Sequence, residues 1–225
     1  MDEIKLIEIK EDIQSDNALV AQDLRNRLQR DQTLMINLMS SPGSGKTSLL
    51  LRTIDALKDE INIGVIEADI DSVVDCEKIA ETGIPSVQLR TGGFCHLDAT
   101  MVKKGLDGLD NPALDLVFIE NVGNLVCPAE FDTGAIKDAM ILSVPEGDDK
   151  PLKYPLMFTK ASVLIVNKID YMQLSDFDSA RLRSHVNRLN PDIALFEVSC
   201  KTGEGINQWV DWLKKTISEF KGVSG

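Results

Sequence analysis

The sequence is poor in basic residues and lacks features that mark membrane or nucleic-acid-binding proteins. Its 225 residues include 24 Lys and Arg against 36 Asp and Glu, which gives a formal net charge of −12. This acidic balance argues against duplex nucleic acid as the main partner, because clustered basic side chains bind phosphate backbones. No apolar run approaches the ~20 residues that a membrane-spanning helix needs. We therefore expect neither nucleic acid nor a membrane among its partners.

Cysteine is also scarce, and its placement excludes a disulfide framework. The four cysteines have none of the close spacing found in disulfide-rich secreted domains. The first residues, Met1-Asp2-Glu3-Ile4-Lys5, contain neither the basic nor the apolar region of a signal peptide. Free thiols are typical of a reducing compartment, so we expect a cytoplasmic protein.

What the sequence does contain is a glycine-rich phosphate-binding motif at residues 40–47, Ser-Ser-Pro-Gly-Ser-Gly-Lys-Thr. It lies between an apolar run and a helical pattern, and this order of strand, turn and helix binds phosphate chains. Lys46 would contact the β and γ phosphates, and the Thr47 hydroxyl would bind Mg²⁺. The strict pattern has Gly where Ser40 stands. The residues expected to contact the nucleotide here are Pro42, Gly43, Ser44, Gly45, Lys46, Thr47 and Ser48.

Two further motifs indicate that the nucleotide base is guanine. Asn167-Lys168-Ile169-Asp170 follows a buried apolar run and matches the Asn-Lys-x-Asp signature of GTPases. Asp170 can accept hydrogen bonds from both N1–H and N2–H₂ of guanine, a pair of donors that adenine lacks. Ser199-Cys200-Lys201 stands where GTPases carry Ser-Ala-Lys. These signals favour GTP and argue against an ATP-driven enzyme.

Apolar runs and helical patterns alternate along the chain and predict an α/β fold. We expect strands at 34–39, 61–67, 85–90, 114–120, 138–144, 161–167 and 193–198. We expect helices at about 46–58, 72–82, 96–106, 152–159, 176–189 and 205–220. Such alternation predicts a doubly wound, mostly parallel sheet with helices on both faces, as in P-loop NTPases. We assign residues 31–225 to this domain and residues 1–30 to an amphipathic helical segment at its edge.

Acidic residues at the ends of two predicted strands are candidate magnesium ligands. Glu120-Asn121-Val122-Gly123 reads Glu-x-x-Gly, where most GTPases have Asp-x-x-Gly. Glu120 would hold Mg²⁺, while the Gly123 N–H would contact the γ-phosphate and lose that partner on hydrolysis. Asp69, with Asp75 as a weaker candidate, would bind Mg²⁺ or orient the attacking water; the alternative is a solvated acidic loop. The expected catalytic residues, acting by positioning and charge neutralisation, are Lys46, Asp69, Glu120 and Gly123.

Cys95, His96 and Cys127 form a second group with metal-binding chemistry. Cys95 and His96 follow the strand at 85–90 and open the next predicted helix, and Cys127 comes four residues after Gly123. Both segments leave carboxyl ends of the sheet and can meet there, where two thiolates and an imidazole suit Zn²⁺ or Ni²⁺. Three ligands leave a four-coordinate site open to water or to a second subunit. The alternative from spacing alone is that the cysteines are core residues.

The two segments around these residues resemble the HypB family. They are residues 93–99, Gly-Phe-Cys-His-Leu-Asp-Ala, and residues 120–128, Glu-Asn-Val-Gly-Asn-Leu-Val-Cys-Pro. The resemblance implies a P-loop GTPase that assists nickel insertion during [NiFe]-hydrogenase maturation. It also implies GTP-dependent homodimers with Zn²⁺ or Ni²⁺ between the subunits, and two partners, a HypA-type metallochaperone and the hydrogenase large-subunit precursor. Residues 1–33 contain no Cys or His, so we expect the N-terminal nickel site of many members to be missing.

Two other protein classes are compatible with part of this pattern. A urease-type nickel GTPase would carry a Cys-Pro-His motif, which is absent from the sequence. A GTP-dependent switch without metal would leave Cys95 and Cys127 as core residues. Because only residues 124–126 separate Gly123 from Cys127, we expect loss of the γ-phosphate to be felt at the metal ligands. GTP binding and metal binding would then be linked.

Overall fold

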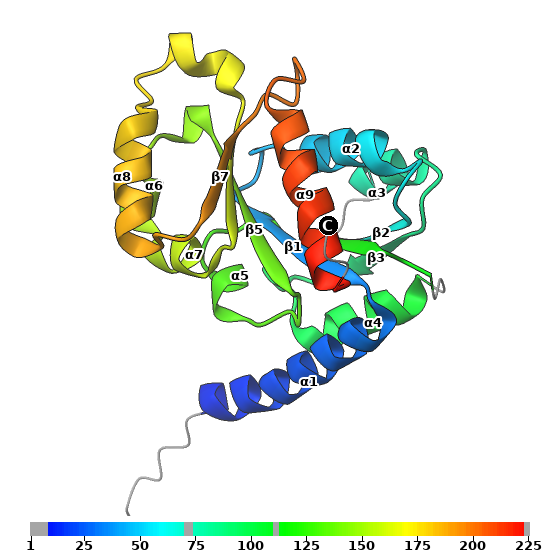
Figure 1. Cartoon of the computed structure of the whole chain (residues 1–225). Coiled ribbons are helices and arrows are strands. Elements are labelled where there is room, and N and C mark those ends of the chain that lie inside the picture. The colour runs from blue at the N-terminus through cyan, green and yellow to red at the C-terminus, as the bar shows by residue number, and fades with distance from the viewer. Residues whose placement is uncertain (1–8, 70–73, 110–112, 223–225) are drawn as a thin grey trace, which may run out of the picture.

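The computed structural model describes residues 9–69, 74–109 and 113–222, with the backbone alone for residues 9–15, 69 and 74–76. At its centre is a seven-stranded sheet in the order β3-β2-β4-β1-β5-β6-β7 (Figure 1). Every neighbouring pair of strands is parallel, which confirms the predicted doubly wound sheet. The strands are β1 (Leu34–Ser40), β2 (Ile63–Asp69), β3 (Ser86–Arg90), β4 (Leu116–Glu120), β5 (Lys137–Ser143), β6 (Val163–Asn167) and β7 (Ala194–Glu197).

Helices cover both faces of the sheet, as predicted (Figure 1). One face carries α2 (Lys46–Leu57), α3 (Val74–Ala80) and α9 (Ile206–Phe220). On the other face, α1 (Ile9–Asp31) and α4 (Ala99–Gly108) lie side by side over β1, β2 and β4. The β5–β6 side of that face is covered by α5 (Cys127–Glu130), η1 (Val144–Glu146), α7 (Pro155–Lys160), η2 (Ile169–Leu174) and α8 (Ser179–Leu189), and α6 (Lys150–Lys153) packs on α7 and α8.

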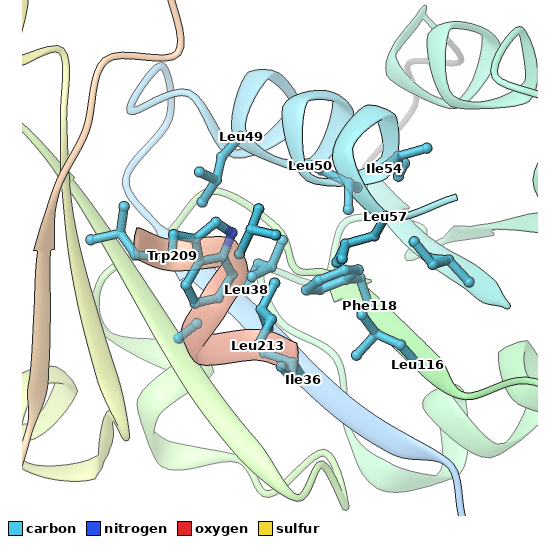
Figure 2. Close-up of a cluster of buried hydrophobic side chains, with 14 of the residues drawn as sticks. Ile36, Leu38, Leu49, Leu50, Ile54, Leu57, Leu116, Phe118, Trp209 and Leu213 are labelled. Atoms are coloured by element: carbon cyan, nitrogen blue, oxygen red, sulfur yellow. The ribbon is translucent and has the colours of Figure 1, made fainter. Parts of the chain in front are cut away.

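The core between α2, α9 and the sheet fixes the helix that follows the phosphate motif. Figure 2 shows apolar side chains of α2 and α9 pointing at β1 and β4. Ile36 and Leu38 face this cluster, whereas Met35 belongs to the cluster on the opposite face, because side chains alternate along a strand. The buried Trp209 donates its Nε1–H to Thr53 Oγ1 at 2.9 Å, so its one polar atom is satisfied. The labelled side chains are Ile36, Leu38, Leu49, Leu50, Ile54, Leu57, Leu116, Phe118, Trp209 and Leu213.

Each strand boundary lies within two residues of its predicted place, but two helix predictions are wrong in detail. The helix expected at 96–106 begins at Ala99, because Asp98 is its N-cap and accepts from Met101 N at 2.8 Å. Cys95 and His96 therefore precede the helix and do not open it. The helix expected at 152–159 is two short helices, since a residue before proline avoids helical geometry and Tyr154 precedes Pro155.

The carboxyl ends of the strands gather the predicted motif residues at one edge of the sheet. The phosphate motif follows β1, Glu120 ends β4, and Asn167 ends β6. Glu67 of β2 pairs in register with Glu120 of β4, which places a second buried carboxylate beside the motif. In parallel sheets this edge is where ligands bind. Among the helices that the structure describes, none combines the length and apolar character that a bilayer crossing requires.

Candidate nucleotide site and metal cluster

Two glycines let the phosphate motif turn sharply into α2. Gly43 and Gly45 have positive φ angles of 77° and 99°, which side chains other than glycine rarely adopt. A Cβ on Gly45 would also lie 2.4 Å from Asn167 Nδ2, so the site has no room for a larger residue. Helix α2 begins at the next residue, Lys46, and its N-terminal N–H groups face the loop. This geometry is that of an anion site at a helix N-terminus.

A pocket of about 340 Å³ lies over this loop. The Thr47 hydroxyl donates to Glu120 Oε1 at 2.7 Å, which brings two of the predicted magnesium ligands together. Lys46 Nζ donates to Ser40 Oγ at 3.1 Å. Ser40 therefore supplies a hydrogen-bond acceptor for the motif lysine at the position where the strict pattern has glycine. The pocket is lined by Gly43, Gly45, Lys46, Thr47, Ser48, Glu67, Ala68, Lys78, Glu120, Asn121, Gly123 and Lys168.

Gly123 lies directly against the phosphate motif. A Cβ on it would come within 3.0 Å of Pro42, so only glycine allows this approach without a shift. The preceding segment is fixed, because Asn121 donates from its backbone N to Leu38 O at 3.1 Å and from Nδ2 to Asn37 Oδ1 at 3.0 Å. Gly123, the residue expected to contact the γ-phosphate, therefore lies next to the phosphate loop.

A second pocket, of about 270 Å³, continues from the first toward the predicted guanine-binding residues. Asn167 joins three segments: its Nδ2 donates to Ser44 O at 2.9 Å, and its Oδ1 accepts from Lys168 N at 2.8 Å and Cys200 N at 3.2 Å. Lys168 Nζ donates to Gly43 O at 2.7 Å and braces the phosphate loop. The pocket lining is Gly45, Ser48, Asn167, Lys168, Asp170, Tyr171, Cys200 and Lys201.

Asp170 and its neighbours are oriented by the loop after β7. Ser199 Oγ donates to Asp170 Oδ1 at 2.6 Å, which holds the carboxylate at the wall of the pocket. Burial raises the pKa of Cys200 to about 11, so this thiol stays protonated at neutral pH and has a structural role here. The structure thus gathers Asn167, Lys168, Asp170, Cys200 and Lys201 around one cavity beside the phosphate loop.

Glu146 is a residue of this site that the sequence patterns did not single out. Its Oε2 accepts from Ser44 Oγ at 2.8 Å, from Ser143 N at 2.7 Å and from Ser143 Oγ at 2.7 Å, and its Oε1 accepts from Ser41 Oγ. One carboxylate therefore ties two serines of the phosphate loop to the end of β5. The Ser143-Val144-Pro145-Glu146 spacing of a capping box was the local signal that could have found it.

Two expected magnesium ligands cannot be placed in this pocket. Asp69 is the last residue of β2 and Asp75 lies in α3, and the side chains of both lie outside the described residues. Their proposed roles in magnesium binding and water orientation stay predictions.

Cys95, His96 and Cys127 do converge. Their ligand atoms all lie within 4.8 Å of one another, with Cys95 Sγ 3.0 Å from Cys127 Sγ and 3.9 Å from His96 Nδ1. All three side chains are half-buried, so the two cysteines are not core residues. The His96 ring stacks on Phe131 with centroids 3.7 Å apart and planes at 17°. Two sulfurs and one imidazole form a donor set that suits a borderline-soft divalent metal.

The protonation of the cluster is shaped by its surroundings. Burial lowers the pKa of His96 below its ordinary value, against the opposing effect of the Asp98 and Glu130 carboxylates, so its imidazole is neutral at pH 7. The hydrogen bond shared with Cys95, together with burial, raises the pKa of the Cys127 thiol. Binding a metal ion here would therefore release thiol protons.

Comparison with known proteins identifies the family. Residues 34–197 match the family described as CobW/HypB/UreG, nucleotide-binding domain. The hydrogenase maturation factor HypB of Azotobacter vinelandii is 46% identical over 211 residues, which cover 94% of this chain and 70% of that protein. HypB from Archaeoglobus fulgidus superposes with a TM-score of 0.84 at 35% identity, over 90% of this chain and 99% of that one. HypB from Helicobacter pylori in complex with nickel superposes with a TM-score of 0.85 at 34% identity, over 91% of this chain and 96% of that one. The chain therefore belongs to the CobW/HypB/UreG nucleotide-binding family and, within it, to the HypB hydrogenase maturation factors.

Proposed function

We propose that this chain is a GTPase that assists nickel insertion into the [NiFe]-hydrogenase large subunit, with its metal cluster coupled to the bound nucleotide. The observation that carries this proposal is the path from Gly123 to Cys127. Gly123 lies against Pro42 of the phosphate loop, and four residues later the Cys127 sulfur lies 3.0 Å from that of Cys95. A displacement of Gly123 on loss of the γ-phosphate would reach the metal ligands through this short segment.

The nucleotide half of the mechanism is charge neutralisation and positioning. Lys46 and the N–H groups at the start of α2 would hold the phosphates, and Gly123 would contact the γ-phosphate. Thr47 and Glu120, already in contact, would hold a Mg²⁺ ion, with Asp69 and Asp75 as further proposed ligands. Magnesium, when bound, neutralises charge on the β and γ phosphates.

Base recognition is assigned to Asp170, with Asn167 and Lys168 holding the two pockets together. The Asp170 carboxylate would accept from N1–H and N2–H₂ of guanine. Asp170→Asn should shift preference from GTP toward xanthosine triphosphate, since xanthine offers an acceptor where guanine has N2–H₂. Competition binding of the two nucleotides measures this shift, and an unchanged preference would contradict guanine recognition by this residue.

The metal half needs further donors from outside the cluster. Two thiolates and an imidazole leave one position open in a four-coordinate site. Phe94 and Val126, 57% and 49% exposed, stand beside the ligands Cys95 and Cys127. An apolar rim of this kind is what a second subunit would cover, so we assign the missing donors to the same residues of a partner in a GTP-dependent homodimer. The nickel complex of the Helicobacter pylori relative supports nickel as the metal carried, with Zn²⁺ as the alternative.

A HypA-type metallochaperone and the hydrogenase large-subunit precursor are the proposed partners of the loaded dimer. Nickel favours square-planar and Zn²⁺ tetrahedral geometry, so the shape of the dimer interface would discriminate between the two metals. Hydrolysis would loosen this interface and release nickel toward the acceptor.

The decisive experiment is a Ni²⁺ titration of the full chain bound to GDP and to a non-hydrolysable GTP analogue. We expect the analogue form to bind Ni²⁺ at least about fivefold more tightly, the lower end of typical allosteric coupling. Cys127→Ala should abolish the difference and most of the binding. Equal affinities in the two nucleotide states would overturn the coupling, and unchanged binding in Cys127→Ala would overturn the metal assignment.

A further inference from the structure

One side chain of the N-terminal helix contacts both segments that carry the metal ligands. Asn17 of α1 is 9% exposed. Its Oδ1 accepts from Ala99 N at 2.9 Å, and its Nδ2 donates to Asp132 O at 2.8 Å. Helix α1 lies against α4 along the lower edge of the molecule in Figure 1, so this amide is held between the two segments.

The first contact fixes the chain next to Cys95 and His96. Ala99 is the first residue of α4 and comes three residues after His96. Its N–H has no partner within its own helix turn, because the first N–H groups of a helix point outward along the axis. Asn17 of α1 accepts the hydrogen bond from this N–H. Leu97, which lies between His96 and Ala99 in the sequence, is fully buried. The start of α4 is thereby held in place close to the two ligands.

The second contact fixes the chain beyond Cys127. Asp132 follows Phe131, and the Phe131 ring stacks on the His96 imidazole. Phe131 N also donates to Cys127 O at 3.3 Å, closing the short helix α5. Holding the Asp132 carbonyl therefore holds the ring that orients His96 and the helix that carries Cys127.

Two more residues of α1, Arg25 and Leu24, contact the same segment. Arg25 pairs with Asp132 Oδ1 at 2.5 Å and donates through Nε to Ala135 O at 3.2 Å. A Cβ on Gly134 would lie 3.0 Å from Leu24, so the segment packs directly on the helix. These contacts join α1 to the Asp132 segment alone, whereas Asn17 contacts both that segment and the start of α4.

We propose that Asn17 is a positioning residue of the metal cluster, one that sets the separation of the Cys95–His96 and Cys127 segments. The inference rests on the proposed metal role of these three residues. It makes α1 part of the metal centre although none of its described side chains is a ligand. Groups behind the ligands that orient them commonly change metal affinity by about 10–100-fold when removed.

The test compares Asn17→Ala, Asn17→Asp and Asn26→Ala in the full chain. Asn26 is an exposed asparagine on the same helix and serves as the matched control. Ni²⁺ affinity is measured by competition with a chromogenic chelator. A second readout, made without metal, is the rate at which dibromobimane bridges the two thiols, with Cys127→Ser as the blank. The denaturant midpoint of each variant checks the stability of the fold, and its affinity for a GTP analogue checks the nucleotide site.

We expect Asn17→Ala to weaken Ni²⁺ binding about tenfold and to slow thiol bridging, with GTP-analogue affinity unchanged and Asn26→Ala like the parent. Asn17→Asp keeps the acceptor for Ala99 N but loses the donor to Asp132, so a smaller loss is expected; it carries the test if Asn17→Ala does not fold. A lowered denaturant midpoint with unchanged Ni²⁺ affinity and bridging rate would overturn the proposal. If Cys127→Ala binds Ni²⁺ as well as the parent does, the metal role itself fails, and with it this inference.

Discussion

The nucleotide pocket and the metal cluster lie at the same edge of one sheet, but they are held in different ways. In the pocket, Asn167 joins the phosphate loop to two other segments through three hydrogen bonds, and it is almost fully buried. The proposed metal ligands are half-buried and stand beside exposed apolar residues. The first region is organised before its ligand arrives, whereas the second is a partial donor set. A preorganised site loses less entropy on binding, and a partial one can be completed or broken by a partner.

The sharpest way to separate the two regions is Gly45→Ala. The new Cβ would meet Asn167 Nδ2 at 2.4 Å in a backbone with φ of 99°. Strain and the lost hydrogen bond together amount to about 3 kcal/mol, so we expect at least ~100-fold weaker binding of a fluorescent GTP analogue. Ni²⁺ affinity of the nucleotide-free protein should stay within about twofold of the parent.

Gly83→Ala is the matched control, because Gly83 has a similar φ of 79° with nothing within 4 Å of the added carbon. It should leave both affinities unchanged. A large loss of nucleotide binding in this control would mean that general backbone strain, and not the contact with Asn167, explains the Gly45 result.

Glu146→Gln should weaken nucleotide binding less than Gly45→Ala does. The amide keeps one acceptor oxygen where the carboxylate accepts from Ser41, Ser44 and Ser143. We expect about tenfold weaker GTP-analogue binding, about 1.4 kcal/mol, by isothermal titration, with Ni²⁺ affinity unaffected. Glu219→Gln, at an exposed glutamate of α9, should match the parent. Equal losses at both sites would show that the two regions are not separable.

The free energy of unfolding should depend on pH through Asp148, which follows η1 in the chain. Burial acts to raise the pKa of Asp148, but hydrogen bonds from Arg181 and from Asp178 N lower it below 3.8. A lowered pKa in the folded state stabilises the protein above the unfolded value, and this contribution is lost as pH falls below about 3.8. Arg181 is 54% exposed and solvent screens its charge, so Asp148→Asn should cost about 1 kcal/mol at pH 7.

Urea unfolding from pH 7 down to pH 3 measures this contribution. The difference between parent and Asp148→Asn should be constant down to about pH 4 and then shrink. The neighbouring Asp149, with a 47% exposed side chain, is the control, and Asp149→Asn should show a smaller difference. A gap that persists at pH 3 would assign the loss to packing and not to charge.

The smallest expected effect is a change in Ni²⁺ affinity at the Cys95–His96–Cys127 cluster. Phe131→Leu removes the ring stacked on His96 and should weaken Ni²⁺ binding about threefold, since aromatic stacking contributes roughly 0.5–1.5 kcal/mol. Phe94 meets His96 only edge-on, with centroids 6.4 Å apart, so Phe94→Leu should have less effect. Chelator competition measures both variants. A reversed order would mean that the exposed ring, and not the stacked one, orients the imidazole.

Much of the nucleotide site could be predicted from local patterns, because each motif is contiguous and sits where a strand ends. For the metal cluster, the sequence indicated that the Cys95–His96 and Cys127 segments can meet at the carboxyl edge, but it left core cysteines as an alternative, since no local pattern fixes a contact between residues 32 positions apart. Glu146 and Asn17 were not predicted to act at either site. Glu146 contacts a phosphate-loop serine about 100 residues away in the sequence. Asn17 contacts residues about 80 and 115 positions away.

The sequence by itself determined the strands and the turns of the phosphate loop, and it singled out the residues that we propose to read guanine, because alternation, glycine placement and short motifs act over a few neighbouring residues. Only the tertiary structure decided how β3 and β4 come to flank β2, about 10 Å apart, so that the segments leaving them meet. It also decided that α1 packs across both segments. Contacts of this kind depend on strand order and helix packing, which no local pattern encodes.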